Sequence, residues 1–369
     1  MDTVKTSKTD EANGTKTMEA VVKTESGYDN MELKQIPIPE VTGDKVLLKV
    51  AYTGICGTDI HTFKGQYANA VTPLVLGHEF SGEVVKVGPD VTTLKPGDRV
   101  TSETTFATDE TCVYCQNKEY NLCPNRVGIG TKANGSMANY VLTREESAHV
   151  LPDNVSYKMA AMSEPLASCV HAMYQKTPFT LHDTLLIIGP GPMGLLSLQI
   201  AKEIGAFVIV SGITKDADRL QIAKELGADI VVDTQKEDLS KVVMDATDGI
   251  GVTKVYDCSG ATPAVNAALP LIRKGGTFQQ VGLFAKPMNE LDERSIIQHE
   301  ITYRGSRSQN PYDWSIALHL ESKGAINQDA MITKVFDLEH WRDAFDAMMA
   351  GKELKVMIAS NPDDPDLAD

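Results

Sequence analysis

The sequence predicts a chain of two parts, a β-barrel-like unit followed by an α/β unit with a doubly wound parallel sheet. Between residue 18 and about residue 155, short β-rich runs recur with Gly and Pro between them, which is typical of an all-β barrel. From residue 184 onward, short apolar runs alternate with helical stretches, which indicates a parallel sheet flanked by helices. The length of 369 residues also favours two domains over one. The predicted fold class is therefore α/β plus β.

The first unit is predicted from short strands rich in β-branched residues. These runs are Met18–Val22, Val46–Val50, Gly82–Val87 and Arg99–Val100. Residues 1–17 are polar and lack the apolar core of a secretory signal, so we expect a flexible leader there. We expect residues 18–165 and 300–369 to form the first unit and residues 166–299 to form the second.

The second unit is predicted from strands and helices that follow one another in turn. Thr184–Ile188 is a continuous apolar run, as expected of a parallel strand buried on both faces. Further strands are predicted at 207–210, 230–232, 254–257 and 277–281, and helices at 195–204, 216–226 and 239–246. Helices near 314–322 and 338–350 are expected after the chain has returned to the first unit.

Composition excludes several classes of partner and location. The net charge of −15 argues against nucleic acid or an anionic membrane as a partner, because phosphate binding needs a basic surface. No apolar run approaches the roughly 18 residues needed to span a bilayer. Six cysteines are too few and too clustered for a disulfide framework in a chain of this length, which favours metal ligation. We expect a cytoplasmic protein that acts on a small molecule.

A glycine motif after the first parallel strand predicts a dinucleotide site. Gly189 permits a tight turn, Gly191 lets the backbone approach a pyrophosphate, and Gly194 allows close packing of helix on strand. The helix that follows would present free N–H groups and a positive dipole end to the phosphates. The alternative is a glycine turn without a ligand, which the strand–turn–helix context makes the weaker interpretation.

The second parallel strand ends without the acid that grips the ribose hydroxyl of NAD. Gly212 stands there, and Lys215 and Arg219 follow. Loss of the carboxylate removes repulsion against a 2′-phosphate, which the two cations are suited to bind. We therefore expect NADP to be accepted, beside NAD. Lys215 and Arg219 could equally be solvated residues of a first helical turn.

A thiol, an imidazole and a carboxylate occur close together near the N-terminal side of the first unit. Cys56 is followed by His78 and Glu79, with glycines on either side. Thiolate and imidazole are preferred ligands of Zn²⁺, and a carboxylate can complete the set or lie beside it. The alternative is a buried Cys and a core His that are neighbours by chance.

Three further thiols lie on one loop of the same unit. Cys112, Cys115 and Cys123 are separated by two and then seven residues. A closed tetrahedral site needs a fourth ligand, and Asp109 precedes Cys112 by the same spacing of two residues. We predict a structural zinc site of one aspartate and three cysteines. The alternative is a lost site with free thiols, because a carboxylate weakens the preference for Zn²⁺.

These motifs in this order resemble the zinc-dependent medium-chain dehydrogenases, the family of alcohol, sorbitol and threonine dehydrogenases. The resemblance covers residues 18 to about 358 and rests on the cysteine loop, the glycine turn, Gly54–Asp59, Gly77–Glu79 and Ser163–Ala167. It implies a GroES-like β-barrel catalytic domain and a Rossmann cofactor domain, with the C-terminal segment returning to the first.

The resemblance also implies the ligands of a catalytic metal. Cys56 and His78 match ligand positions, and Glu164 stands where polyol dehydrogenases have a glutamate and alcohol dehydrogenases a cysteine. Glu79 is the adjacent carboxylate, which ligates directly or by exchange. The chain thus resembles the polyol (sorbitol and threonine dehydrogenase-like) branch. One thiolate with two carboxylates is a harder donor set than two thiolates, so Mn²⁺ is a possible occupant in place of Zn²⁺.

Within that branch the chain is similar to polyol-phosphate dehydrogenases, such as arabitol-phosphate and galactitol-phosphate dehydrogenases. The segment Ser211–Asp216 and Phe80 carry this similarity. Arg307 and Arg126 are candidates to bind a substrate phosphate. Both could equally be surface ion-pair residues, because no spacing fixes their geometry.

The activity implied is hydride transfer from a secondary alcohol to NAD(P), which gives a ketose. Thr58 is placed to relay the hydroxyl proton, and His61 to pass it outward. A plain turn residue and a surface histidine are the alternatives. As a second hypothesis, the substrate is threonine or a vicinal diol; as a third, the protein binds dinucleotide without catalysis. Buried ligands would be costly to keep in a retired site, which argues against the third. We expect a homodimer or homotetramer.

Overall fold

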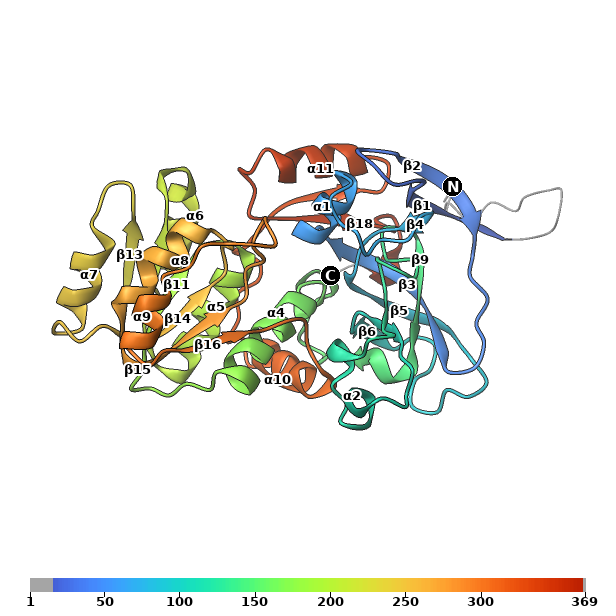
Figure 1. The fold of residues 1–369 in the computed structure, drawn as a ribbon. Coiled ribbons are helices and arrows are strands. Elements are labelled where there is room, and N and C mark those ends of the chain that lie inside the picture. The colour runs from blue at the N-terminus through green and yellow to red at the C-terminus, as the bar shows by residue number, and fades with distance from the viewer. Residues whose placement is uncertain (1–15, 368–369) are drawn as a thin grey trace. The chain divides into compact units, whose positions relative to one another are not determined.

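The computed structural model describes residues 16–367, which form two compact units (Figure 1). The first unit holds the described residues up to Glu164, Asn310–Leu318 and the residues from Ile332 onward. The second holds Pro165–Gln309 and His319–Met331. The predicted leader lies outside the described residues except for its last two positions, and the first strand already begins at Thr17.

The first unit is built on sheets whose strands pair antiparallel, except that β17 (Ile332–Asp337) and β18 (Lys355–Ala359) pair in parallel. One sheet has the order β2 (Met31–Pro37), β1 (Thr17–Lys23), β4 (Leu74–Val75). A larger one has the order β10 (Ala148–Val150), β6 (Arg99–Ser102), β5 (Glu79–Val87), β3 (Lys45–Gly54), β18 (Lys355–Ala359), β17 (Ile332–Asp337), and β9 (Tyr140–Arg144) also pairs with β3. A third pairs β7 (Thr105–Ala107) with β8 (Val127–Gly128). The prediction of a β-rich first unit is confirmed.

Alternation along β3 explains why this sheet forms. Val46, Leu48 and Val50 are fully buried and share one core with Phe80 and Val84 of the neighbouring strand β5. Successive side chains of a strand point to opposite faces, so this period of two places the three apolar residues on one side. Strand β3 then runs on to Gly54, which carries the chain directly to Cys56.

The helices of the first unit are short, with at most nine residues each. They are α1 (Gly57–Phe63), α2 (Val113–Gln116), α3 (Tyr157–Ala160) and α11 (Trp341–Met349), with 3₁₀ turns at Tyr120–Leu122, Glu145–Ser147 and Pro365–Leu367. Two helices cross the boundaries of the units: α4 (Ser163–Val170), which continues into a π-helical stretch at His171–Lys176, and α10 (Pro311–Ser322), whose residues from His319 onward belong to the second unit.

The second unit contains a six-stranded parallel sheet. Its order is β13 (Ile230–Asp233), β12 (Phe207–Gly212), β11 (Thr184–Ile188), β14 (Val252–Asp257), β15 (Ile272–Gln280), β16 (Thr302–Gly305). The connecting helices are α5 (Pro192–Ile204), α6 (Ala217–Glu225), α7 (Leu239–Ala246), α8 (Thr262–Ala268) and α9 (Glu293–Gln298), with 3₁₀ turns at Thr214–Asp216 and Leu269–Leu271. Strand order reverses between β11 and β14, and such a switch point is where parallel sheets bind ligands. The predicted doubly wound sheet is confirmed.

Strand β16 lies beyond residue 299, after which we expected the chain to leave this unit. Thr302–Gly305 instead pairs in parallel with β15, so the sheet gains its sixth strand there.

The helices described between residues 16 and 367 include none that is both long and apolar enough to cross a membrane.

Candidate active site

The loop that carries Cys56 is fixed by a buried carboxylate three residues later. Asp59 is 1% exposed and accepts hydrogen bonds from the backbone N–H of Cys56 (2.9 Å) and of Gly77 (3.2 Å). It lies at the third position of α1, where an acid typically caps the helix start. Because Gly77 immediately precedes His78, one side chain holds both candidate ligand segments. Sequence reasoning overlooked Asp59, although its spacing from the helix start is a capping signal.

Cys56, His78 and Glu79 are brought together by these elements. Each offers one ligand atom, and the three atoms lie within 4.8 Å of one another. His78 is buried, and its Nδ1 has no hydrogen-bond partner among the described residues, although Asp59 Oδ1 lies 3.7 Å away. Burial lowers the pKa of His78, but Asp59, Cys56 and Glu164 together raise it by more than burial lowers it. The pKa of His78 therefore lies well above its usual value. A buried polar atom without a partner, inside a ring of anionic groups, fits a bound cation.

Glu79 is paired with a cation from the far end of the sequence. Its carboxylate accepts from the ammonium of Lys355, which also donates to the carbonyl of Ile55 at 3.2 Å. Both charged side chains are 3% exposed. Burial lowers the pKa of Lys355, while the carboxylate of Glu79 and the thiol of Cys56 raise it by more. Lys355 was not anticipated from sequence, since a lysine inside an apolar strand carries no local signal for this pairing.

The other residues predicted for this site lie nearby or at its margin. Glu164 is 9% exposed in the first turn of α4; its atoms are not part of the three-atom cluster, but its charge acts on His78. Thr58 lies on α1 with its hydroxyl 3.8 Å from the sulfur of Cys56. His61 is exposed on the same helix and its Nδ1 lies 3.2 Å from Gln66 Oε1.

The loop cysteines form a second cluster in the first unit. Ligand atoms of Asp109, Cys112, Cys115 and Cys123 all lie within 4.8 Å of one another. Asp109 Oδ1 accepts from the backbone N–H of Cys112 (2.9 Å), and Asn125 donates to the other oxygen (3.0 Å). These bonds hold the pKa of Asp109 well below its usual range, whereas burial raises the pKa of the Cys115 thiol to about 11. Three sulfurs and one ionised oxygen, gathered this closely, fit a four-ligand zinc site.

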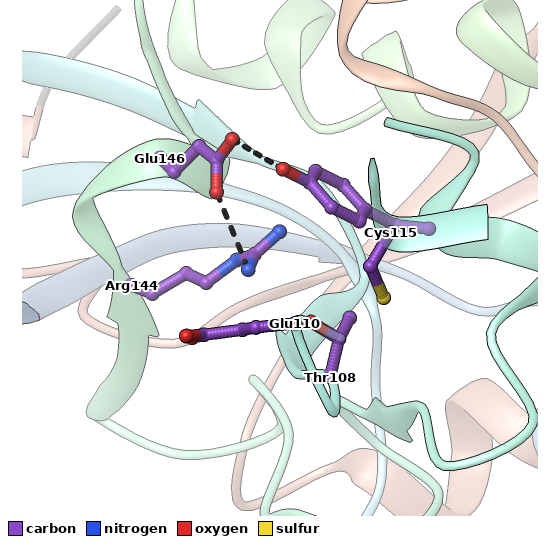
Figure 2. A pocket seen from close by; sticks show the side chains of 6 residues that line it. Thr108, Glu110, Cys115, Arg144 and Glu146 are labelled. Carbon is purple, nitrogen blue, oxygen red and sulfur yellow. Dashed lines mark hydrogen bonds and ion pairs between the residues drawn. The ribbon is translucent and has the colours of Figure 1, made fainter. Parts of the chain in front are cut away.

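A cavity of about 300 Å³ lies beside this cluster (Figure 2). Cys115 lines it together with Arg144, Glu146 and other side chains, some of which stabilise the cysteine loop. Arg144 pairs with Glu146 at 3.4 Å, and Figure 2 shows the two side chains turned toward each other. Arg144 also lies over the ring of Tyr120, 4.7 Å from its centroid, and the hydroxyl of Tyr120 donates to Glu146 at 2.6 Å. Tyr120 begins the 3₁₀ turn Tyr120–Leu122, and Cys123 follows directly after it. The contacts among Tyr120, Arg144 and Glu146 therefore help to hold the sulfur of Cys123 in place.

The glycine turn has the geometry that dinucleotide binding requires. Gly189 follows β11 with φ of +94°, in the region that favours glycine. Gly191 caps α5, and Pro192 occupies its first turn. A Cβ on Gly194 would overlap the carbonyl oxygen of Gly189, so only glycine lets the helix pack this closely on the turn. The N-terminus of a 13-residue helix thus opens at the carboxyl edge of the sheet.

The residues predicted to select the cofactor lie at the end of β12. Gly212 is its last residue, Lys215 is exposed in the following 3₁₀ turn, and Arg219 is half-buried on α6. The nearest acid on this strand–turn–helix connection, Asp216, accepts from the backbone N–H of Ile213 at 3.2 Å and so caps the turn.

The two arginines proposed for a substrate phosphate differ in their surroundings. Arg126 donates through Nε to the hydroxyl of Thr105 at 2.9 Å and through Nη2 to Thr104. These bonds tie it to the segment that contains β7. Arg307 is exposed on the segment after β16.

A parallel sheet with a glycine turn, together with a sulfur–imidazole–carboxylate cluster on a β-unit, is typical of metal-containing dehydrogenases that use a dinucleotide. Comparison with known proteins agrees. Residues 42–153 match the alcohol dehydrogenase GroES-like domain, and residues 192–323 match the zinc-binding dehydrogenase domain. The chain belongs to the zinc-binding alcohol dehydrogenase family. The predictions of fold, dehydrogenase activity, zinc and NAD(P) are confirmed by this membership.

Individual relatives match almost the whole chain. A D-arabitol-phosphate dehydrogenase from Enterococcus avium is 67% identical over 349 residues, which cover 95% of this chain and 99% of the relative. A sorbitol dehydrogenase from Halalkalibacterium halodurans is 45% identical, covering 92% and 99%. Among solved structures, a putative zinc-binding dehydrogenase from Sinorhizobium meliloti bound to NADP is 32% identical, with a TM-score of 0.86 over 93% of this chain and 99% of that one.

Proposed function

We propose that this protein oxidises a secondary alcohol of a polyol phosphate, such as an arabitol phosphate, to the corresponding ketose phosphate with NAD(P) as hydride acceptor. The observation that carries the proposal is the 67% identity to a D-arabitol-phosphate dehydrogenase over nearly the full length of both chains. Oxidation of a free polyol is the second candidate, favoured by the 45% identity to a sorbitol dehydrogenase.

In this proposal Cys56, His78 and Glu164 hold the catalytic zinc, with Glu79 as a neighbouring or exchanging ligand. The close approach of Cys56, His78 and Glu79 and the unpartnered nitrogen of His78 support the assignment. When bound, the ion supplies Lewis-acid polarisation of the alcohol oxygen, which lowers the pKa of the hydroxyl. Lys355 orients Glu79 through their ion pair, and Asp59 holds the loops of the two ligands in place. Mn²⁺ is the alternative occupant.

The hydroxyl proton must leave as the hydride departs. Thr58 is proposed to take it, because its hydroxyl lies 3.8 Å from the Cys56 sulfur and therefore next to the reacting centre. His61 lies one turn later on the same helix and is exposed, so it can release the proton to water.

For the cofactor, Gly189, Gly191 and Gly194 are proposed to surround the pyrophosphate. Gly212 leaves room at the ribose, and Lys215 and Arg219 would favour a 2′-phosphate, so NADP is accepted beside NAD. Arg307 and Arg126 are the proposed partners of the substrate phosphate. Arg126 would have to exchange its bonds to two threonine hydroxyls for the phosphate. The cluster of Asp109 with three cysteines is proposed to hold a structural zinc.

A homodimer or homotetramer and a cytoplasmic location complete the proposal. Strand β16 pairs on one side only within the described sheet, and Leu283, Met288 and Ile297 are large apolar side chains exposed in the same unit. Exposed apolar groups of this kind favour association. Light scattering after size exclusion gives the assembly state. None of the six cysteines, all of which lie within the described residues, forms a disulfide, which favours a reducing compartment.

The experiment is a substrate screen with purified protein. Free polyols and their phosphates are offered with NAD and with NADP, and reduced cofactor is followed by absorbance before chelation, after chelation and after return of Zn²⁺ or Mn²⁺. We expect kcat/KM to be highest for a polyol phosphate and to vanish on chelation. Equal or better turnover of the free polyols would replace the first candidate with the second. Metal retention without reduction of either cofactor by any alcohol would favour a non-catalytic protein.

A further inference from the structure

Asp257, at the carboxyl end of β14, is a carboxylate of the second unit that accepts four hydrogen bonds. It is fully buried. Oδ1 accepts from the backbone N–H of Ser259 at 3.0 Å and from its hydroxyl at 2.6 Å. Oδ2 accepts from the backbone N–H of Gly260 at 3.0 Å and from the amide of Gln280. The four donors are two backbone N–H groups, one hydroxyl and one side-chain amide.

The backbone of the same residue ties a second loop to the first. The carbonyl of Asp257 accepts from the N–H groups of Val281 (3.0 Å) and Gly282 (2.7 Å). The side chain of Gln280 bridges both loops, because its amide also donates to the carbonyl of Gly282 at 2.6 Å. Asp257 therefore joins the loop after β14, residues 258–261, to the loop after β15, residues 281–284.

The first of these loops packs on the phosphate-binding turn. A Cβ added to Gly189 would lie 3.1 Å from Cβ of Ser259 and 3.3 Å from its Cα and N, so this loop leaves little room for a side chain at the turn. The N–H of Cys258 donates to the carbonyl of Ile188 at 2.9 Å, which links the start of the loop to the residue before that turn. All of this lies at the carboxyl edge between β11 and β14, where the strand order reverses and a dinucleotide binds.

We propose that Asp257 is a positioning residue for the dinucleotide: through Ser259 and Gly260 it sets the loop that supports the Gly189 turn, and so it controls cofactor affinity. It does not touch the reacting atoms. The inference rests on dinucleotide binding in this unit but not on the identity of the alcohol. Loss of the carboxylate should therefore raise the Kd of the cofactor while leaving kcat at saturating cofactor nearly unchanged.

Asp257→Asn is the decisive variant. An amide has the same shape but one acceptor, so its NH₂ must face either both donors from Ser259 or those from Gly260 and Gln280. Two donors then confront each other in a buried site, and the loop must move to relieve them. We expect the Kd for NADH or NADPH, measured by the fluorescence of the reduced nicotinamide, to rise about tenfold.

Asp183→Asn is the matched control. Asp183 is a buried carboxylate just before β11, at the opposite edge of the same sheet, where it accepts from the N–H of Thr180 (2.7 Å) and pairs with Lys254 (2.7 Å). The two variants should lower Tm comparably, yet Asp183→Asn should leave the Kd within about twofold of wild type. A general loss of stability cannot produce that split.

The outcomes separate the inference from the proposed function. An unchanged Kd in Asp257→Asn, equal rises in both variants, or a fall in kcat without a rise in Kd would overturn the inference while wild type still binds and turns over. Failure of wild type to bind either dinucleotide would refute the proposed function and the inference with it. Should Asp257→Asn not fold, Ser259→Ala removes one of the four donors to Asp257, together with the acceptor of the Ala261 N–H in the same loop, and should raise the Kd about threefold. No rise there would also overturn the inference.

Discussion

The buried ion pair of Glu79 and Lys355 gives a stability prediction whose size follows from the structure. Each charged side chain is 3% exposed, and the pair joins β5 to β18 across 276 positions of sequence. Replacing Lys355 by Met keeps the length of the side chain but leaves a buried carboxylate without its cation. Breaking a buried pair in this way costs about 3–5 kcal/mol. A Tm shift of about 2–4 °C per kcal/mol makes this a fall of roughly 6–20 °C.

The assay is thermal unfolding of wild type, Lys355→Met, Glu79→Gln and the double variant, with bound metal measured for each. The double variant removes both charges, so it should recover most of the stability that Lys355→Met loses. Lys241→Met is the matched control, because its pair with Asp245 is exposed (72% and 65%) and should contribute no more than about 0.5 kcal/mol. A Tm for Lys355→Met within 2 °C of the control, at equal metal content, would refute the reasoning. A double variant less stable than Lys355→Met would do the same.

Four further predictions test the sites. Cys56→Ala should abolish turnover while the Kd of the dinucleotide stays within about twofold of wild type, and normal turnover would remove Cys56 from the ligand set. Gly212→Asp should weaken NADP relative to NAD by about tenfold or more in kcat/KM, with Gly212→Ala as the steric control; an equal ratio in both excludes a charge effect. Cys115→Ser should lower bound zinc by about one ion per chain, measured by elemental analysis, and reduce Tm, measured by calorimetry. An unaltered zinc content would mean that the cysteine loop holds no zinc. Gly135→Ala should prevent soluble expression or greatly reduce Tm, because its Cβ would overlap the backbone oxygens of Leu76 and Gly77. Gly57→Ala is the control and should be nearly neutral, because its Cβ would meet open space. Similar Tm values for both variants would contradict the packing around Gly135.

Several features could be predicted from the sequence because their causes are local. The apolar run at Thr184–Ile188 and the glycines that follow predict a buried parallel strand and a phosphate-binding turn, and both are present. The spacing of Asp109 and the three loop cysteines allows only a compact turn, so their clustering also follows from short-range geometry. Asp59 belongs to this class as well, since its distance from the start of α1 already marks it as a capping residue.

The sequence by itself therefore determined the alternation of strands and helices, the glycine turn and the two groups of candidate ligands, because residues close along the chain dictate periodicity, turns and caps. Only the tertiary structure decided that Lys355 neutralises Glu79, which depends on β18 pairing with β3 beside β5. It also decided that Asp257 joins two loops behind the Gly189 turn, since parallel pairing of β14 with β11 and β15 brings those loops to one edge. Contacts of this kind arise from the register of distant strands, and nothing in the local sequence specifies which polar residue will meet which.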